Sequence, residues 1–132
     1  MRVLALDHGE ARCGCALSDP SGTLATPIGA VERPDTRRRL AAIAALVDEH
    51  GVERMVVGLP LTLAGEEGEQ ARRARAFADR LAARVSVPVE LWDERLTSRQ
   101  ADRSGGGADR DSRAAAHLLD AWLQAHPAGT SA

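Results

Sequence analysis

Three carboxylates at widely separated positions are the residues best suited to chemistry in this sequence. Asp7 closes the apolar run 3–6, Glu94 closes the predicted strand 88–94, and Asp111 opens the last amphipathic segment. Mg²⁺ and Mn²⁺ prefer such oxygen ligands, and two ions about 3.5 to 4 Å apart stabilise the attacking and leaving oxygens of phosphoryl transfer. Without cations the three charges would repel one another. The spacing therefore favours a two-metal site, provided that the fold brings these residues together.

Each carboxylate also has a simpler structural interpretation. Asp7 stands in an Asp-x-Gly turn and can accept backbone hydrogen bonds there. Asp111 in a first helical turn complements the helix dipole, although Asp109 already serves that purpose. Asp93 and Glu94 are neighbours on one strand, so they point to opposite faces and at most one of them easily joins Asp7. The residues alone leave these alternatives open.

Length and composition limit the classes of protein. The chain of 132 residues suits one domain, predicted over 1–125, with a disordered tail over 126–132. Aromatic residues are scarce, with Phe77, Trp92 and Trp122 as the full set, which argues against base stacking on an aromatic platform. No apolar run approaches about 18 residues, so we expect no membrane contact and a cytoplasmic location.

The net charge of the chain is close to zero, so any binding of phosphate must come from local clusters of cationic side chains. The net charge is -2, and all 17 cationic side chains are Arg. Each guanidinium can make a bidentate phosphate contact. Arg95, Arg99 and Arg103 recur every four residues beside Glu94, which on a helix makes a stripe that is either solvated or aimed at phosphate.

The predicted elements place the carboxylates at element ends. The run 3–6 reads as a strand buried on both faces, and Gly9 and Gly14 are expected to allow a tight reversal into an antiparallel strand over 13–17. A third strand is predicted over 23–26, at the sheet edge because Pro27 follows it. Cys13 and Cys15 share one strand face and are interpreted as core residues.

Helices and two further strands follow. A helix whose first turn holds Pro34 ends near Gly51, a strand covers 54–59, and a second amphipathic helix follows the acidic loop 61–68. The last strand is predicted over 88–94, a capping box over 97–100 predicts a short helix, and the final helix spans about 110–125 with Asp109 as its cap. In that helix Asp111, Ala115, Leu118 and Trp122 form one stripe, which predicts that it faces the sheet.

Four motifs in this order resemble the YqgF/RuvX family. They are Asp7-x-Gly9-x-x-Arg12-x-Gly14-x-Ala16, then Val57-Gly58-Leu59-Pro60 with Gly65, then Asp93-Glu94-Arg95-Leu96-Thr97-Ser98, and Asp111-x-x-Ala114-Ala115. The resemblance runs from Arg2 to about Ala125. It implies an α/β RNase H-like fold, in which a five-stranded mixed sheet with three antiparallel first strands has helices on both faces.

The resemblance also implies a metal-dependent nuclease, with RNA favoured, acting in 5′-end maturation of pre-16S rRNA and leaving 5′-phosphate and 3′-hydroxyl ends. Its catalytic metal ligands, for two Mg²⁺ or Mn²⁺ ions, would be Asp7, Glu94 and Asp111. Nucleic-acid contacts are expected from Arg12, Arg95, Thr97, Ser98, Arg99 and Arg103, and structural loops from Gly9, Gly58 and Pro60.

One departure and several alternatives remain. The basic stretch between Glu94 and Asp111 is shorter than in the family and contains Gly105-Gly106-Gly107, which should affect substrate binding and substrate choice more than the chemistry.

A Holliday junction resolvase acting on branched DNA would use the same ions and would favour a homodimer over a monomer. A non-catalytic nucleic-acid-binding module of the same fold is a further class. An actin-like ATPase would need two such domains, and this chain has room for one.

Overall fold

A mixed sheet of five strands forms the centre of the molecule, and the computed structural model describes residues 1–96 and 107–127. The first three strands are antiparallel: β1 (Val3–His8), β2 (Arg12–Ser18) and β3 (Ala25–Glu32). On the other side of β1, β4 (Arg54–Leu59) and β5 (Val89–Asp93) pair in parallel. The strand order is β3-β2-β1-β4-β5, which confirms the predicted sheet.

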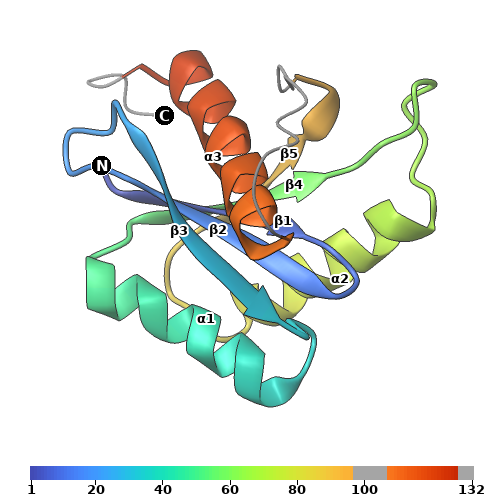
Figure 1. Cartoon of the computed structure of the whole chain (residues 1–132), viewed down its shortest axis with the longest axis horizontal. Coiled ribbons are helices and arrows are strands. Elements are labelled where there is room, and N and C mark those ends of the chain that lie inside the picture. The colour runs from blue at the N-terminus through green and yellow to red at the C-terminus, as the bar shows by residue number, and fades with distance from the viewer. Residues whose placement is uncertain (97–106, 128–132) are drawn as a thin grey trace.

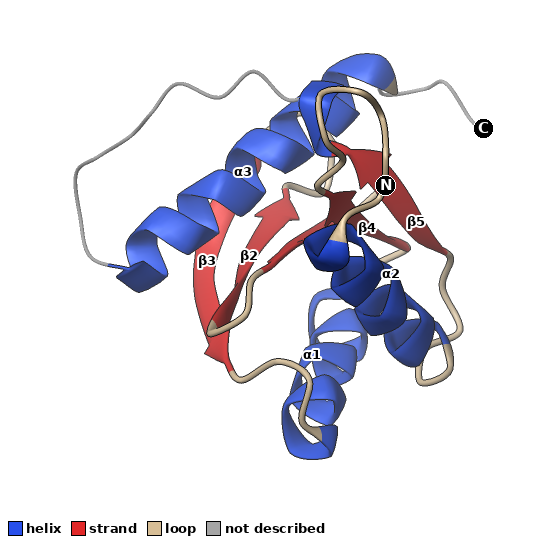
Figure 2. Cartoon of the chain, turned by 90° about the vertical axis from the view of Figure 1, so that its right-hand side faces the viewer, coloured by secondary structure: helices blue, strands red, loops and turns tan. Residues whose placement is uncertain are grey.

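Helices cover both faces of this sheet, as predicted. α1 (Arg37–His50) and α2 (Glu69–Ala82) lie on one face, and α3 (Gly107–Ala125) crosses the other (Figure 1, Figure 2). A 3₁₀ turn, η1 (Glu94–Leu96), follows β5. Within the described residues, none of these helices has the length and apolarity that crossing a bilayer requires.

Side-chain alternation along β1 divides the core into two clusters and orients the residues that follow. Leu4 and Leu6 pack with the layer of α1 and α2, whereas Val3 and Ala5 pack with α3. Because successive side chains on a strand point to opposite faces, Asp7 faces α3. His8 faces the other side and stacks on Phe77 of α2, with ring centroids 4.6 Å apart. The end of β1 therefore presents one polar side chain to each face.

The third strand differs most from the prediction. It spans Ala25–Glu32 instead of 23–26, and thus continues through Pro27 and Gly29. Two features accommodate these residues. β3 is an edge strand, where a missing N–H is tolerated, and the register shifts between Cys15 and Ala16 of β2.

Two predicted helix starts are also wrong. α1 begins at Arg37, after Thr36 caps it by accepting the amide of Arg39 at 3.3 Å, so Pro34 precedes the helix. α3 begins at Gly107, which places Asp109 inside the first turn instead of at the cap. Gly51 does end α1 in the left-handed conformation, with φ of 63°, as predicted. The short helix predicted over 97–100 lies outside the described residues.

A buried hydroxyl joins the first two strands at their far end. The amide of Val3 donates to Oγ of Ser18 at 2.7 Å, and Ser18 is buried. We expect Ser18→Ala to lower the free energy of unfolding by about 1 to 3 kcal/mol, because the buried N–H of Val3 would lose its acceptor. Urea denaturation measures this, with the exposed Ser86→Ala as the control. Equal stability of the two variants would contradict the assignment.

Candidate active site

Gly14 on β2 lies next to Asp7 on one side and against the backbone of Asp111 on α3. Gly14 pairs with Asp7 across the antiparallel ladder. A Cβ on Gly14 would collide with the main-chain carbonyl of Asp111 and would lie 3.0 Å from the amide nitrogen of Ser112. The backbone of α3 at Asp111 and Ser112 therefore rests directly on β2, and only glycine permits this approach. Gly14 is thus needed inside the strand and not, as predicted, for the reversal before it.

The reversal itself is closed by Gly9. Its amide donates to the carbonyl of Arg12 at 2.9 Å, and a Cβ on Gly9 would lie 2.7 Å from that oxygen. This tight turn sets the start of β2 and the position of the Arg12 side chain. The prediction that Gly9 has a structural role in the loop is consistent with this geometry.

Arg12 holds the carboxylate of Asp111. Its Nε donates to Oδ2 of Asp111 at 2.8 Å, and the two side chains are 36% and 30% exposed. The partners are 99 positions apart in the sequence. The pair therefore ties the first hairpin to the start of α3 and holds Asp111 above the end of β1.

Glu94 reaches the same face of the sheet from η1, directly after β5. Gly58, predicted to belong to the loop beside the site, lies inside β4, and a Cβ on it would lie 2.9 Å from Oε1 of Glu94. Gly58 follows Val56 by two positions, and Val56 packs with the α3 cluster, so the Glu94 carboxylate lies on the α3 side. The prediction that Glu94 belongs to the last strand is wrong, because β5 ends at Asp93 and Glu94 opens η1. Its carboxylate still lies on the face of the sheet that carries Asp7.

The donor chemistry suits a hard divalent cation. Asp7, Glu94 and Asp111 offer carboxylate oxygens on one face of the sheet, and the missing Cβ atoms of Gly14 and Gly58 leave the room that two of them use. No group of three Asp, Glu, His or Cys side chains lies close enough to hold an ion in residues 1–96 and 107–127. Asp111 is engaged by Arg12 in this conformation.

Arg95 pairs with a carboxylate that is not one of the three. Its Nη2 lies 2.7 Å from Oδ2 of Asp93, and its Nη1 donates to the carbonyl of Leu63 at 3.4 Å. The hydrogen bonds from Arg95 lower the pKa of Asp93 below its usual value. Arg95, predicted to contact nucleic acid, thus links η1 to the loop after β4.

The remaining predicted residues divide into two groups. Pro60 directly follows β4 and is half-buried, which fits its predicted place in the loop beside the site. Four predicted nucleic-acid contacts lie outside the described residues: Thr97, Ser98, Arg99 and Arg103. Cys13 and Cys15 are buried and free, as predicted, and a hydrogen bond with Cys15 raises the pKa of the Cys13 thiol.

Sequence reasoning missed the ion pair between Arg12 and Asp111. Arg12 was expected to contact nucleic acid, and no local pattern links it to a residue 99 positions away. The motifs contain a weak signal for this ion pair. Arg12 and Gly14 lie on the same face of the strand, and α3 packs against Gly14. That signal requires the docking of α3 to be known first.

Comparison with known proteins gives a family and its relatives. A family model described as RuvX, Holliday junction resolvase, matches residues 1–125. A relative from Desulforudis audaxviator is 38% identical over 98% of each chain. One from Myxococcus xanthus is 42% identical over 96% of this chain and 89% of its own. Both carry the provisional name pre-16S rRNA nuclease.

Solved structures with a similar fold include two of RuvC from Thermus thermophilus. Thermus thermophilus RuvC with its Holliday junction substrate has a TM-score of 0.60 and 15% identity, over 97% of this chain and 98% of that one. The same protein in another structure has a TM-score of 0.58. At this identity the similarity concerns the fold alone.

Proposed function

The chain belongs to the RuvX family and has the RNase H-like fold, and on that basis we propose that it is a nuclease that hydrolyses phosphodiester bonds in 5′-end maturation of pre-16S rRNA. The observation that supports the proposal is that three carboxylates from distant elements face the same side of the sheet, although within residues 1–96 and 107–127 they do not lie close enough together to hold an ion. Asp7 is the last residue but one of β1, Glu94 opens η1 directly after β5, and Asp111 is the fifth residue of α3. Relatives of similar length carry the same functional name.

Asp7, Glu94 and Asp111 would hold Mg²⁺ or Mn²⁺. The ions, when bound, supply a water of lowered pKa and neutralise the charge on the phosphate and the leaving oxygen. The chain's own contribution is orientation. Asp7 lies on a strand with buried neighbours, Glu94 lies over Gly58, and Asp111 is held by Arg12. Rigid elements position ligands more precisely than loops do.

Arg12 is a positioning residue in this proposal. We expect Arg12→Gln to reduce the cleavage rate about 10- to 100-fold, the range seen when a partner of a metal ligand is removed. The free energy of unfolding should change by less than about 1 kcal/mol, because the pair is partly exposed.

The matched variants are Arg12→Lys and Arg38→Gln. Arg12→Lys keeps the charge and should recover part of the rate, although it lacks the guanidinium fork. Arg38 is exposed on α1, on the other face, so Arg38→Gln should cleave at the wild-type rate. Single-turnover rates with saturating substrate measure the effect. An unchanged rate for Arg12→Gln would remove Arg12 from the site.

The substrate test compares RNA with branched DNA. Single-stranded RNA carrying the 5′ extension of 16S rRNA and a four-way DNA junction are incubated with Mg²⁺ or Mn²⁺ beside the Asp7→Asn variant. Cleavage of the RNA that requires Asp7 supports the proposal. Binding of either substrate without any metal-dependent cleavage would instead indicate a non-catalytic module.

Resolution of Holliday junctions is the second candidate, and the description of the matching family favours it. Symmetric cutting of two strands requires two sites held apart, as in a homodimer. Symmetric nicks in the four-way junction by a dimeric species would support this function. Cleavage of RNA by a monomer would argue against it.

A further inference from the structure

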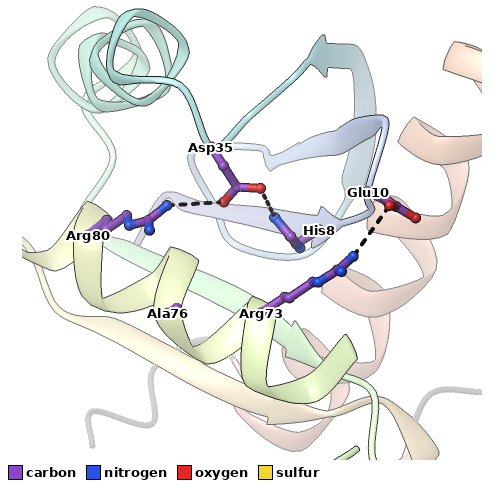
Figure 3. A pocket seen from close by; sticks show the side chains of 6 residues that line it. All are labelled: His8, Glu10, Asp35, Arg73, Ala76 and Arg80. Carbon is purple, nitrogen blue, oxygen red and sulfur yellow. Dashed lines mark hydrogen bonds and ion pairs between the residues drawn. The ribbon is translucent and has the colours of Figure 1, made fainter. Parts of the chain in front are cut away.

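A groove follows α2 on the face of the sheet opposite to α3. Two adjoining hollows form it, with volumes of about 310 and 440 Å³, and they share Asp35 and Arg80. Figure 3 shows the first hollow, with His8 between the side chains of Arg73 and Arg80. The small side chain of Ala76 lies on α2 between those two arginines. The groove thus begins beside the end of β1 and continues past the end of α2.

A chain of polar contacts connects β1 to this groove. The His8 side chain is 2% exposed, and its Nε2 lies 2.9 Å from Oδ2 of Asp35. The other carboxylate oxygen of Asp35 lies 3.7 Å from Nη1 of Arg80. Nδ1 of His8 is buried and has no hydrogen-bond partner in the described part of the chain. The groove wall is therefore anchored to the strand that carries Asp7.

Positive charge is in excess at the second hollow. Its lining includes three guanidinium groups, of Arg37, Arg80 and Arg84, and a single carboxylate, of Asp35. Arg37 and Arg84 form no ion pair within residues 1–96 and 107–127, and Arg80 has only the long contact with Asp35 there. At the other end Arg73 is matched by Glu10 and Glu69, at 3.5 and 2.9 Å. The cationic end can accept an anion without giving up a close pair.

We infer that the cationic end of this groove, Arg37, Arg80 and Arg84, binds the phosphodiester backbone of the substrate strand at nucleotides beyond the cleaved bond. The inference rests on the proposed function. Asp7 and His8 are consecutive residues, about 3.8 Å apart along the backbone, and they face opposite sides of the sheet. A strand that leaves the carboxylates over the end of β1 reaches the groove directly. Guanidinium groups bind phosphate through paired N–H donors, which makes this contact independent of sequence.

The test measures binding of two single-stranded RNAs, of about 4 and about 16 nucleotides, in EDTA so that no cleavage occurs. The variant is Arg80→Ala with Arg84→Ala, and both residues are exposed, so the fold should persist. For the long RNA we expect affinity to fall about tenfold, and the slope of log K against log salt concentration to fall by about 1.4, the loss of two phosphate contacts. Affinity for the short RNA should stay within about twofold of wild type, because it does not reach the groove.

The matched control removes two charges from another side of the same helix, through Arg72→Ala with Arg75→Ala, since both arginines contact Glu67 outside the groove. The inference is supported if this control binds the long RNA with the wild-type salt dependence and the groove variant binds it with lower affinity and a smaller slope. Equal weakening in both variants overturns it, because net charge alone would then explain binding. If the wild-type protein cleaves RNA and the groove variant binds the long RNA with wild-type affinity, the groove is overturned and the nuclease proposal stands. A wild-type protein that binds neither RNA in EDTA overturns the groove, and its cleavage of RNA with Mg²⁺ or Mn²⁺ then decides the nuclease proposal separately.

Discussion

Asp7→Asn is expected to lower the rate of RNA cleavage by more than about a hundredfold. Loss of a partner behind a metal ligand costs about 10- to 100-fold, and loss of a ligand itself should cost more. Asparagine has nearly the same shape and keeps one oxygen, but it removes the charge that attracts the cation. Asp7 lies next to the last residue of a strand whose residues 3–6 are buried, so the strand itself should remain in place.

A second measurement separates loss of metal from loss of fold. An ion that binds only the folded state stabilises it by about 2.7 kcal/mol at a concentration of 100 times Kd. The wild-type protein should therefore show a rise in Tm when Mg²⁺ or Mn²⁺ is added, and Asp7→Asn should show little or none. The fold of the variant is checked in EDTA, where both proteins should unfold at similar temperatures.

The control for Asp7→Asn is Asp79→Asn, on the exposed side of α2. It removes the same charge far from the α3 face and should retain both the activity and the rise in Tm with metal. Asp111→Asn should behave like Asp7→Asn. Metal-dependent cleavage by Asp7→Asn at the wild-type rate would refute the assignment of the three carboxylates.

Gly14→Ala is expected to reduce the free energy of unfolding by at least about 3 kcal/mol. Overpacking a core usually costs about 1 to 3 kcal/mol when side chains can yield, and here the atom in the way belongs to the backbone of α3. The helix must move away from β2, which opens contacts of Ala115 and Leu118 with the sheet. Urea denaturation measures the change, and cleavage should fall as well because Asp111 moves with the helix.

Gly58→Ala is the matched comparison, because its clash is with a side chain. A Cβ there would lie 2.9 Å from Oε1 of Glu94, and a glutamate can rotate away. We expect a smaller loss of stability, below about 1.5 kcal/mol, together with a large loss of cleavage as Glu94 leaves the site. Gly68→Ala, with open space around it, should leave cleavage unchanged and cost at most about 1 kcal/mol, because glycine is preferred to alanine at the N-cap of α2. If Gly14→Ala were as stable as Gly68→Ala, the close approach of α3 to β2 would be wrong.

Local patterns in the sequence were sufficient for most of the architecture. Strand burial over 3–6, the αL residue Gly51 and the stripe of Ala115, Leu118 and Trp122 follow from periodicity and capping, and all are present in the fold. The motifs around Asp7, Glu94 and Asp111 predicted the family, which the comparisons confirmed. These features depend on residues within a few turns or strand positions of one another.

Tertiary structure decided what distant segments do to each other. Pro27 lies inside a strand because β3 is at the edge and β2 carries a register shift, neither of which is visible in the residues 23–32. Gly14 is required because a helix begun nearly a hundred residues later lies against it. Arg12 pairs with Asp111 for the same reason. Helix docking depends on the shape of the whole sheet, so the sequence determined which carboxylates are available, and packing decided how each is held.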